Sequence, residues 1–323
     1  MKKIAVLTSG GDAPGMNAAV RAVIRTAIYH GLEVHGIYHG YDGMISGEIK
    51  EFQKPDVANI IHRGGTVLKT ARSETFRTEE GRAKAYKTLA EKGIEGLVVI
   101  GGNGTYTGAL RFSEEHPIKV IGVPGTIDND IYGTDYSIGF DTAINTAIDA
   151  VDKIRDTADS HSRLFFIEVM GRHSGYIALH TGIGSGASAV FLPEKEGSVM
   201  SYIDTLYEGE RRSKLFNLII VAEGNPSGGA QELAAIISEK YEKLDVKTTI
   251  IGHLQRGGSP TASDRVLASQ LGYHAVEGLR AGKTQVAVGI VNKEIVFTPL
   301  NDAITLKKEP NQGMINMSEI LAL

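Results

Sequence analysis

The sequence predicts an α/β protein with doubly wound, mainly parallel sheets, and two observations lead to this fold class. First, apolar runs of strand length alternate with stretches of helical length and spacing along the whole chain. Second, these runs are apolar at consecutive positions, which is typical of parallel strands that helices cover on both faces. At 323 residues, the chain is long for one core and suits either two lobes or one large domain.

Each apolar run is expected to form a strand. The expected strands are residues 4–7, 34–38, 96–100, 120–123, 164–169, 189–192, 218–221, 248–251 and 286–291. The clearest helical stretches are 78–92, 141–158, 231–244 and 262–281. The sequence contains no internal repeat, low-complexity tract or long linker, so periodicity indicates a lobe boundary only loosely, near Gly139.

Composition excludes several classes of protein. The net charge of −4 argues against general nucleic-acid binding, which needs a basic face. The absence of cysteine excludes disulfides, thiolate metal sites and a cysteine nucleophile. The first apolar run is too short for a signal peptide and no run approaches membrane length, so we expect a soluble cytoplasmic protein without a membrane partner.

The segment PGTIDND at 124–130 directly follows an expected strand. Ligand sites of parallel sheets lie beyond the carboxyl ends of the strands. In an extended segment alternate side chains share a face, so Thr126, Asp128 and Asp130 would point into one pocket. One carboxylate could accept a proton from a substrate hydroxyl while the other holds charge or a metal. The alternative is a turn rich in Asp and Asn without chemistry.

Glycine-rich loops follow two other expected strands. The loop TSGGDAPGMN at 8–17 opens a helix, and so does GGNGT at 101–105. Backbone N–H groups in such loops and at helix N-termini bind phosphate, so two loops on adjacent strands suit a polyphosphate. Neither loop has the G-x-G-x-x-G pattern and no acidic residue ends the second strand at Tyr38, which disfavours a nicotinamide dehydrogenase. A tight turn remains the alternative for each.

Charged side chains follow further strands. In the loop around 63–73, Arg72 is a better candidate phosphate clamp than Arg63. After the strand at 248–251 come His253 and Arg256, three positions apart. They could converge on one phosphate monoester, or either could have only a structural capping role.

These motifs resemble those of the bacterial ATP-dependent 6-phosphofructokinases. The matching segments are GGDAPGMN at 10–17, PGTIDND at 124–130, MGR at 170–172, AEG at 222–224 and GHLQRGG at 252–258. They occur in the order and spacing of that family, up to about Thr298. The resemblance implies two lobes with the active site in the cleft between them. The ATP-binding lobe would comprise residues 1–138 plus about 252–305, and the sugar-phosphate lobe 139–251 plus about 306–323.

The resemblance also implies an activity. The family transfers the γ-phosphate of ATP to the 1-hydroxyl of fructose 6-phosphate, giving fructose 1,6-bisphosphate in glycolysis. Asp128 would be the base, assisted by Thr126, Asp130 and Arg172. The implied nucleotide ligands are Gly11, Arg72, Ser73, Gly102, Asn103, Gly104 and Thr105. The implied sugar-phosphate ligands are Thr126, Asp128, Asp130, Arg163, Met170, Gly171, Arg172, Glu223, Lys247, His253 and Arg256.

Family members are typically homotetramers, in which Arg163 and Lys247 would reach in from a neighbouring subunit. An effector site for ADP or phosphoenolpyruvate would lie between subunits. Its matching residues are Arg21, Arg25, Lys54, Arg155, Gly186 and Lys214. Ser188 and Phe216 replace a glutamate and a histidine of the family, which puts the response to either effector in doubt.

Further departures concern the metal and the phosphoryl donor. Asn103 stands where the family's aspartate helps to hold Mg²⁺, and an amide is the weaker ligand. The diphosphate-using branch has Asp and Lys where this chain has Gly104 and Gly125, so ATP is the expected donor. The alternatives are a non-catalytic paralogue that binds nucleotide and sugar phosphate, supported only by Asn103, and a diphosphate-dependent kinase.

Overall fold

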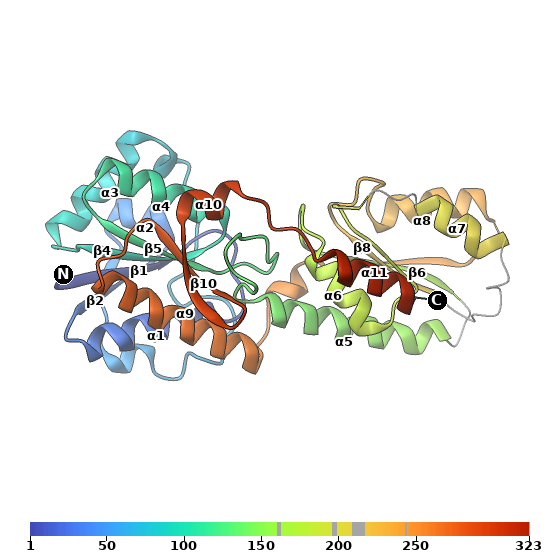
Figure 1. Cartoon of the computed structure of the whole chain (residues 1–323), viewed down its shortest axis with the longest axis horizontal. Coiled ribbons are helices and arrows are strands. Elements are labelled where there is room, and N and C mark those ends of the chain that lie inside the picture. The colour runs from blue at the N-terminus through green and yellow to red at the C-terminus, as the bar shows by residue number, and fades with distance from the viewer. Residues whose placement is uncertain (160–162, 196–198, 209–216, 243, 323) are drawn as a thin grey trace. The chain divides into compact units, whose positions relative to one another are not determined.

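The computed structural model describes residues 1–159, 163–195, 199–208, 217–242 and 244–322. The chain forms two compact units (Figure 1). Unit 1 comprises Met1–Ile127, Ile131–Thr142 and Arg256–Lys308, and unit 2 comprises Asp128–Asp130, Ala143–Gln255 and Glu309–Leu323. The assignment of an ATP-binding lobe and a sugar-phosphate lobe, with the bounds given above, stays a proposal.

Unit 1 is built on a seven-stranded sheet in the order β11-β10-β5-β4-β1-β2-β3. Its strands are β1 (Lys3–Thr8), β2 (Glu33–Ile37), β3 (Ile49–Glu51), β4 (Gly96–Gly101), β5 (Lys119–Pro124), β10 (Val286–Val291) and β11 (Glu294–Pro299). The inner pairs are parallel, whereas β3 and β11 pair antiparallel at the two edges.

Helices cover both faces of the unit 1 sheet, which explains why its inner strands are apolar throughout. Every residue of β4 is buried. One face carries α2 (Gly40–Ser46), α3 (Glu79–Glu91), α4 (Asn103–Glu115) and α10 (Leu300–Thr305). The other carries α1 (Met16–Tyr29) and α9 (Ala262–Arg280), which pack against each other (Figure 1). Two short 3₁₀ turns are η1 (Lys54–Val57) and η2 (Thr75–Arg77).

Unit 2 contains a four-stranded sheet whose pairs are all parallel, in the order β7-β8-β6-β9. The strands are β6 (Leu164–Val169), β7 (Ala189–Phe191), β8 (Asn217–Ala222) and β9 (Val246–Ile250). The helices are α5 (Phe140–Asp159), whose first turn belongs to unit 1, α6 (Tyr176–Ser185), α7 (Val199–Glu208), α8 (Ala230–Lys240) and α11 (Gln312–Leu321). The 3₁₀ turn η4 (Gly252–Arg256) follows β9. The hydrophobic core of unit 2 includes Phe166, Ile219 and Leu233.

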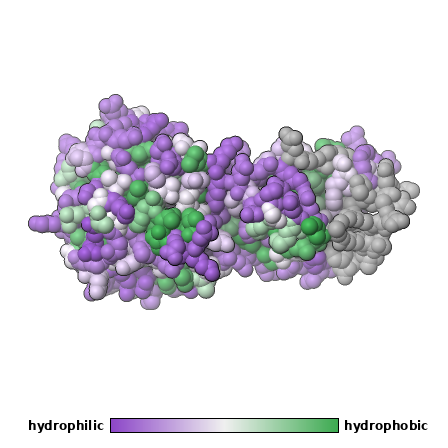
Figure 2. All heavy atoms as spheres, viewed as in Figure 1, coloured by the Kyte–Doolittle hydropathy of each residue, from purple (hydrophilic) through white to green (hydrophobic). Residues whose placement is uncertain are grey.

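The predicted α/β class with mainly parallel sheets is confirmed. Two strands were not predicted, β3 and β11. β3 (IKE) has no apolar run, because an edge strand need not be apolar at consecutive positions, whereas β11 (EIVFTP) has the apolar residues Ile295, Val296 and Phe297 and was simply missed. The prediction of a helix up to residue 244 is wrong, since α8 ends at Lys240. Within the described part of the chain, no helix is long and apolar enough to cross a membrane. Hydrophilic residues cover most of the face seen in Figure 2.

Candidate active site

The loops after β1, β4 and β5 begin side by side, because these strands are neighbours in the unit 1 sheet. Thr8 pairs with Ile100, and Gly101 pairs with Pro124. Two backbone hydrogen bonds extend the ladders, from Ser9 N to the Ile100 carbonyl and from Gly125 N to the Gly101 carbonyl, each 3.0 Å long. The prediction that the two glycine-rich loops lie on adjacent strand ends is therefore confirmed.

The loop after β1 presents backbone N–H groups. Among the described residues, the N–H groups of Gly10, Gly11 and Asp12 have no hydrogen-bond partner. The loop carbonyl groups, by contrast, accept hydrogen bonds from side chains. Those of Ser9, Gly10 and Asp12 accept from Thr105 Oγ1 (3.1 Å), Thr70 Oγ1 and Arg256 Nη1 (3.2 Å), respectively. This arrangement suits an anion, which backbone N–H groups can bind.

Arg256 packs directly on this loop. A Cβ at Gly11 would lie 2.7 Å from Arg256 Nη1, so a larger residue there would displace the guanidinium from its present position. The sequence pointed to a shared phosphate site for Arg256 and His253. The structure assigns Arg256 to unit 1 and His253 to unit 2, and their shared role stays a prediction.

The loop after β4 contains two glycines that differ in surroundings. A Cβ at Gly101 would lie 2.5 Å from the Ser9 carbonyl oxygen, so packing requires glycine at this position. A Cβ at Gly104, in the first turn of α4, would meet no atom within 4 Å. Gly102 and Asn103 begin the same helix, as N-cap and first residue. No described part of the protein therefore explains the absence of a side chain at Gly104.

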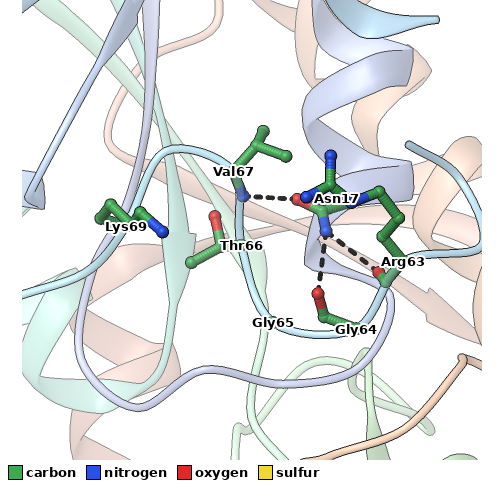
Figure 3. A pocket seen from close by; sticks show the side chains of 7 residues that line it. All are labelled: Asn17, Arg63, Gly64, Gly65, Thr66, Val67 and Lys69. Atoms are coloured by element: carbon green, nitrogen blue, oxygen red, sulfur yellow. Dashed lines mark hydrogen bonds between the residues drawn. The ribbon is translucent and has the colours of Figure 1, made fainter. Parts of the chain in front are cut away.

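A cavity of about 400 Å³ lies in unit 1 beside the segment that leads to Arg72 and Ser73 (Figure 3). Its lining residues are Asn17, Arg63, Gly64, Gly65, Thr66, Val67 and Lys69. Asn17 fixes the shape of the loop, since Nδ2 donates to the carbonyls of Arg63 (3.0 Å) and Gly64 (3.2 Å) and Oδ1 accepts from Val67 N (2.7 Å). Thr8 Oγ1 donates to the Lys69 carbonyl at 2.7 Å, so the loop is tied to β1. The lining contains two cations and no carboxylate.

The segment after β5 is not extended, so the expected alternation of Thr126, Asp128 and Asp130 along one face is wrong. Residues 127–128 form a turn, and Asn129 has a φ of 52°, in the left-handed region that asparagine tolerates. Ser137 Oγ donates to the Thr126 carbonyl at 2.7 Å. Thr126 belongs to unit 1, whereas the two aspartates belong to unit 2.

Within unit 2, Asp128 is 4% exposed and lies beside Arg172, whose Nε is 3.9 Å from Asp128 Oδ2. Ser174 Oγ donates to the Asp128 carbonyl at 2.8 Å. Arg172 has a φ of 53°, which is strained for an arginine. Glu223 Oε1 holds this conformation by accepting from Arg172 N (2.6 Å) and Gly171 N (3.3 Å).

Gln255 supports the same loop and was not predicted as a site residue. Its side chain is fully buried, and Oε1 accepts from Met170 N at 2.8 Å. Its Nε2 has no partner among the described residues. The only signal in the sequence was its position within the GHLQRGG motif. Met170, Gly171, Arg172 and Glu223 are thus brought together at the carboxyl ends of β6 and β8, as predicted.

Arg163 and Lys247 lie at the opposite, amino-terminal edge of the same sheet. Arg163 immediately precedes β6, and Lys247 is the second residue of the parallel strand β9. Both cations bind Asp245: Arg163 Nε lies 2.6 Å from Oδ2, and Lys247 Nζ lies 2.6 Å from Oδ1. These hydrogen bonds lower the pKa of Asp245. The structure does not bring the two cations to Asp128 within one chain.

The residues that resemble the effector site divide between the units. Arg21 and Arg25 are one turn apart on α1, and burial together with the charge of Arg25 lowers the pKa of Arg21. Lys54 begins η1, which packs against α1. In unit 2, Arg155 donates to the Ser185 carbonyl, and Gly186 ends α6 with a φ of 62°. Lys214 and Phe216 lie outside the described residues.

Asp264 is another residue that the sequence did not point to. It is 1% exposed, and its carboxylate accepts from Gly139 N (2.8 Å) and Thr142 N (2.8 Å), which caps the amino end of α5. Burial raises the pKa of Asp264. In the part of the chain that the structure describes, no group of three or more His, Asp or Glu side chains could hold a metal ion.

Known proteins resemble this chain over its full length. The phosphofructokinase family pattern matches residues 3–279. The ATP-dependent 6-phosphofructokinase 1 of Thermus thermophilus is 56% identical over 323 residues, covering 100% of both chains. The ATP-dependent 6-phosphofructokinase of Cytophaga hutchinsonii is 53% identical over 321 residues, covering 99% of this chain and 98% of its own. A phosphofructokinase structure from Saccharomyces cerevisiae superimposes with a TM-score of 0.89 at 38% identity, covering 100% of this chain and 48% of that one. The chain therefore belongs to the phosphofructokinase family.

Proposed function

We propose that this protein transfers the γ-phosphate of ATP to the 1-hydroxyl of fructose 6-phosphate, giving fructose 1,6-bisphosphate. The observation that carries the proposal is the buried carboxylate of Asp128 beside Arg172, in the turn that follows β5. Its bacterial relatives, matched over their whole length, are named ATP-dependent 6-phosphofructokinases.

Asp128 is proposed to accept the proton of the substrate hydroxyl, because a base must lie close to the attacking oxygen. Arg172 and Thr126 would offset the negative charge on the transferring phosphoryl group, with Asp130 completing the site. Phosphoryl transfer depends on in-line positioning and electrostatic stabilisation, and these residue types supply both.

The nucleotide phosphates are assigned to unit 1. The N–H groups of Gly10, Gly11 and Asp12 supply donors without competing protein partners among the described residues. The exposed cation of Arg72 supplies a charged fork. The proposed set is completed by Ser73, Gly102, Asn103, Gly104 and Thr105.

The sugar phosphate is assigned to unit 2, while Arg256, which belongs to unit 1, stays a predicted ligand from the resemblance. Met170, Gly171, Glu223 and His253 are the proposed ligands from this chain. Arg163 and Lys247 lie at the far edge of the sheet, so we infer that they serve the site of a neighbouring subunit. This inference requires an oligomer, and we propose the homotetramer typical of the family.

Gly104 supports ATP as the donor rather than diphosphate. A glycine in a helix costs roughly 0.5–1 kcal/mol relative to alanine, and no protein atom near Gly104 demands it. Space at this position is therefore best explained by a bulky ligand. Gly125 carries less weight than its sequence position suggested. A Cβ there would lie 3.0 Å from side-chain atoms of Ile100 and Met16, so tight packing also favours glycine at this position.

A divalent cation, Mg²⁺ in our proposal, would neutralise charge on the ATP phosphates. Asn103, in the first turn of α4, would supply one neutral amide ligand to this ion. Mg²⁺ commonly keeps several waters and uses few protein carboxylates, so such a site is sufficient. Arg21 and Arg25, whose like charges repel, are proposed to bind an anionic effector such as ADP or phosphoenolpyruvate. A cytoplasmic location stays a prediction.

The test is a coupled assay of the purified protein with fructose 6-phosphate and Mg²⁺, supplied with either ATP or diphosphate. We expect turnover with ATP and none, or far less, with diphosphate. Turnover with diphosphate alone would contradict the donor assignment. Binding of both substrates without turnover would instead indicate a non-catalytic paralogue.

A further inference from the structure

Arg82 is a buried arginine of α3 that links the last residue of α4, Glu115, to the η2 turn that follows the segment carrying Arg72 and Ser73. It is 6% exposed. Nε and Nη2 donate to the two carboxylate oxygens of Glu115 on α4, each at 2.6 Å. Nη1 donates to the carbonyls of Phe76 (3.1 Å) and Arg77 (2.7 Å) in η2. One guanidinium therefore joins three elements of unit 1.

Arg82 and Glu115 both stay charged over the whole physiological pH range. The hydrogen bonds of Glu115 raise the pKa of Arg82, and those of Arg82 lower the pKa of Glu115. A buried pair is favourable only when its geometry is good and further hydrogen bonds support it, and here each of the three guanidinium nitrogens of Arg82 donates to an acceptor. Lysine carries the same charge but cannot bind both oxygens and both carbonyls at once.

The η2 turn transmits this restraint to the segment that carries Arg72 and Ser73. Ser73 Oγ accepts a hydrogen bond from Phe76 N at 3.1 Å. The short segment is therefore fixed at its start by Ser73 and at its end by Arg82.

The ring of Phe76 carries the restraint to the loop after β4. It stacks on the ring of Tyr41, with centroids 4.0 Å apart and planes inclined by 4°. Tyr41 Oη donates to the Thr105 carbonyl at 2.6 Å. Burial raises the pKa of Tyr41 well above its usual value, so the phenol stays a donor. Thr105 Oγ1 in turn donates to the Ser9 carbonyl at 3.1 Å, in the loop after β1.

We propose that Arg82, anchored by Glu115, is a positioning residue for nucleotide binding that acts through Phe76 and Tyr41. This inference rests on the proposed assignment of the nucleotide to unit 1. Irregular loops need support from packed side chains if they are to bind phosphate with defined geometry. A single connected set of contacts begins at the Arg82 guanidinium. It supports the segment of Arg72 and Ser73, the loop after β4 and the loop after β1.

The experiment compares Arg82→Lys, Glu115→Gln and Tyr41→Phe in the full-length protein. Loss of a charged hydrogen bond commonly changes an equilibrium by about tenfold. We therefore expect the KM for ATP to rise about tenfold in the first two variants and somewhat less in Tyr41→Phe. The KM for fructose 6-phosphate should stay within about twofold. The matched control is Lys84→Gln, which breaks the exposed 2.9 Å pair of Lys84 with Glu80 on the same helix and should change neither KM.

Calorimetric titration with a non-hydrolysable ATP analogue and Mg²⁺ supplies a readout that is independent of turnover. The analogue should bind more weakly to the variants by the same factor as the KM for ATP. A folded variant with unchanged analogue affinity, or an equal rise in both KM values, would overturn the inference. If Arg82→Lys fails to fold, Glu115→Gln decides, because it keeps the guanidinium and removes only the charge of its partner. A wild type that binds the analogue without turnover would disprove the proposed function, while the affinity comparison would still decide this inference.

Discussion

The candidate loops of the two units are held in opposite ways. In unit 1, the hydroxyls of Thr70 and Thr105 and the guanidinium of Arg256 donate to loop carbonyl groups. In unit 2, Glu223 and Gln255 accept hydrogen bonds from loop N–H groups. The first arrangement leaves backbone N–H groups available to a ligand, and the second consumes them.

This difference indicates how each unit binds an anion. A phosphate in unit 1 can be bound by the N–H groups of residues 10–12, which require no particular side chain. In unit 2 the N–H groups of residues 170–172 already have acceptors, so side chains such as Arg172 must supply the charge. Single side-chain substitutions should therefore weaken anion binding more strongly in unit 2 than in unit 1.

The largest effect is expected at Asp128, in unit 2. Asp128→Asn keeps the size of the side chain but removes the proposed base, and loss of a general base typically costs about 10²–10⁴-fold in rate. We expect kcat to fall by that factor while the KM for fructose 6-phosphate changes little. Steady-state kinetics with saturating ATP measure both. A variant with nearly full turnover would show that Asp128 is not the base.

The second effect concerns Glu223, which holds the strained Arg172. Glu223→Ala leaves two backbone N–H groups without their acceptor, and an unmet hydrogen bond of this kind costs about 1–3 kcal/mol. We expect the KM for fructose 6-phosphate to rise roughly 5–150-fold, with the KM for ATP nearly unchanged. Glu223→Gln should be milder, because its amide oxygen can still accept.

The matched control for Glu223 is Glu232→Ala, also in unit 2. Glu232 Oε2 likewise accepts from a backbone N–H group, that of Gly229, at 3.1 Å. This contact lies at the start of α8, in a part of unit 2 that the proposed site does not use. Both KM values should therefore stay as in the wild type. Equal changes of the KM values in the Glu223 and Glu232 variants would show that Glu223 has only a general structural role.

Most of the fold and the position of the loops could be predicted from the sequence, because both depend on local patterns. Continuous apolar runs identify buried parallel strands, and glycine clusters after them identify the loops of 8–17 and 101–105. The turn at 127–128 was one of two interpretations of this Asp- and Asn-rich segment, and the sequence could not decide between them, since the Ser137 and Ser174 contacts that shape it come from residues separated from it in sequence. The pairing of Arg82 with Glu115 joins residues 33 positions apart and has no local signature.

The third effect is expected at Gly104, in unit 1. Gly104→Asp adds bulk and negative charge where the protein leaves open space. If the nucleotide phosphates lie there, like charges repel, and we expect the KM for ATP to rise at least about tenfold. The thermal stability should change little, because a Cβ at this position meets no protein atom within 4 Å. An unchanged KM for ATP would remove the argument that Gly104 makes room for the nucleotide.

Two controls separate a ligand effect from a packing effect. Gly104→Ala should be tolerated and should stabilise α4 by up to roughly 0.5–1 kcal/mol. Gly101→Ala should instead destabilise unit 1 by about 1–3 kcal/mol, because its Cβ would press on the Ser9 carbonyl. Thermal unfolding of the three variants beside the wild type measures the contrast.

The smallest expected effect is a pH dependence of the stability of unit 1. His35 on β2 is 7% exposed, and its Nδ1 has no partner among the described residues. Burial, with a contribution from Lys3 and Lys92, lowers the pKa of His35, and Glu33 and Glu51 oppose the shift. The unfolded chain then binds a proton more readily than the folded protein. The stability that is complete above the ordinary histidine pKa of about 6.5 is therefore lost as the pH falls toward the lower pKa of the folded state.

His35→Gln removes this titration and keeps a polar side chain of similar size. The melting temperature of the wild type should fall between pH 7.5 and pH 5.5, and the variant should recover about 2–4 °C of that fall. His274 on α9, whose pKa burial also lowers, accounts for part of the remainder and also belongs to unit 1. Hydrogen exchange at the two pH values locates the effect, since protection should decrease first in peptides of β2 rather than in those of β6 or β8. A decrease that begins in unit 2, or an identical pH dependence of wild type and variant, would show that His35 does not make unit 1 the acid-sensitive part of the chain.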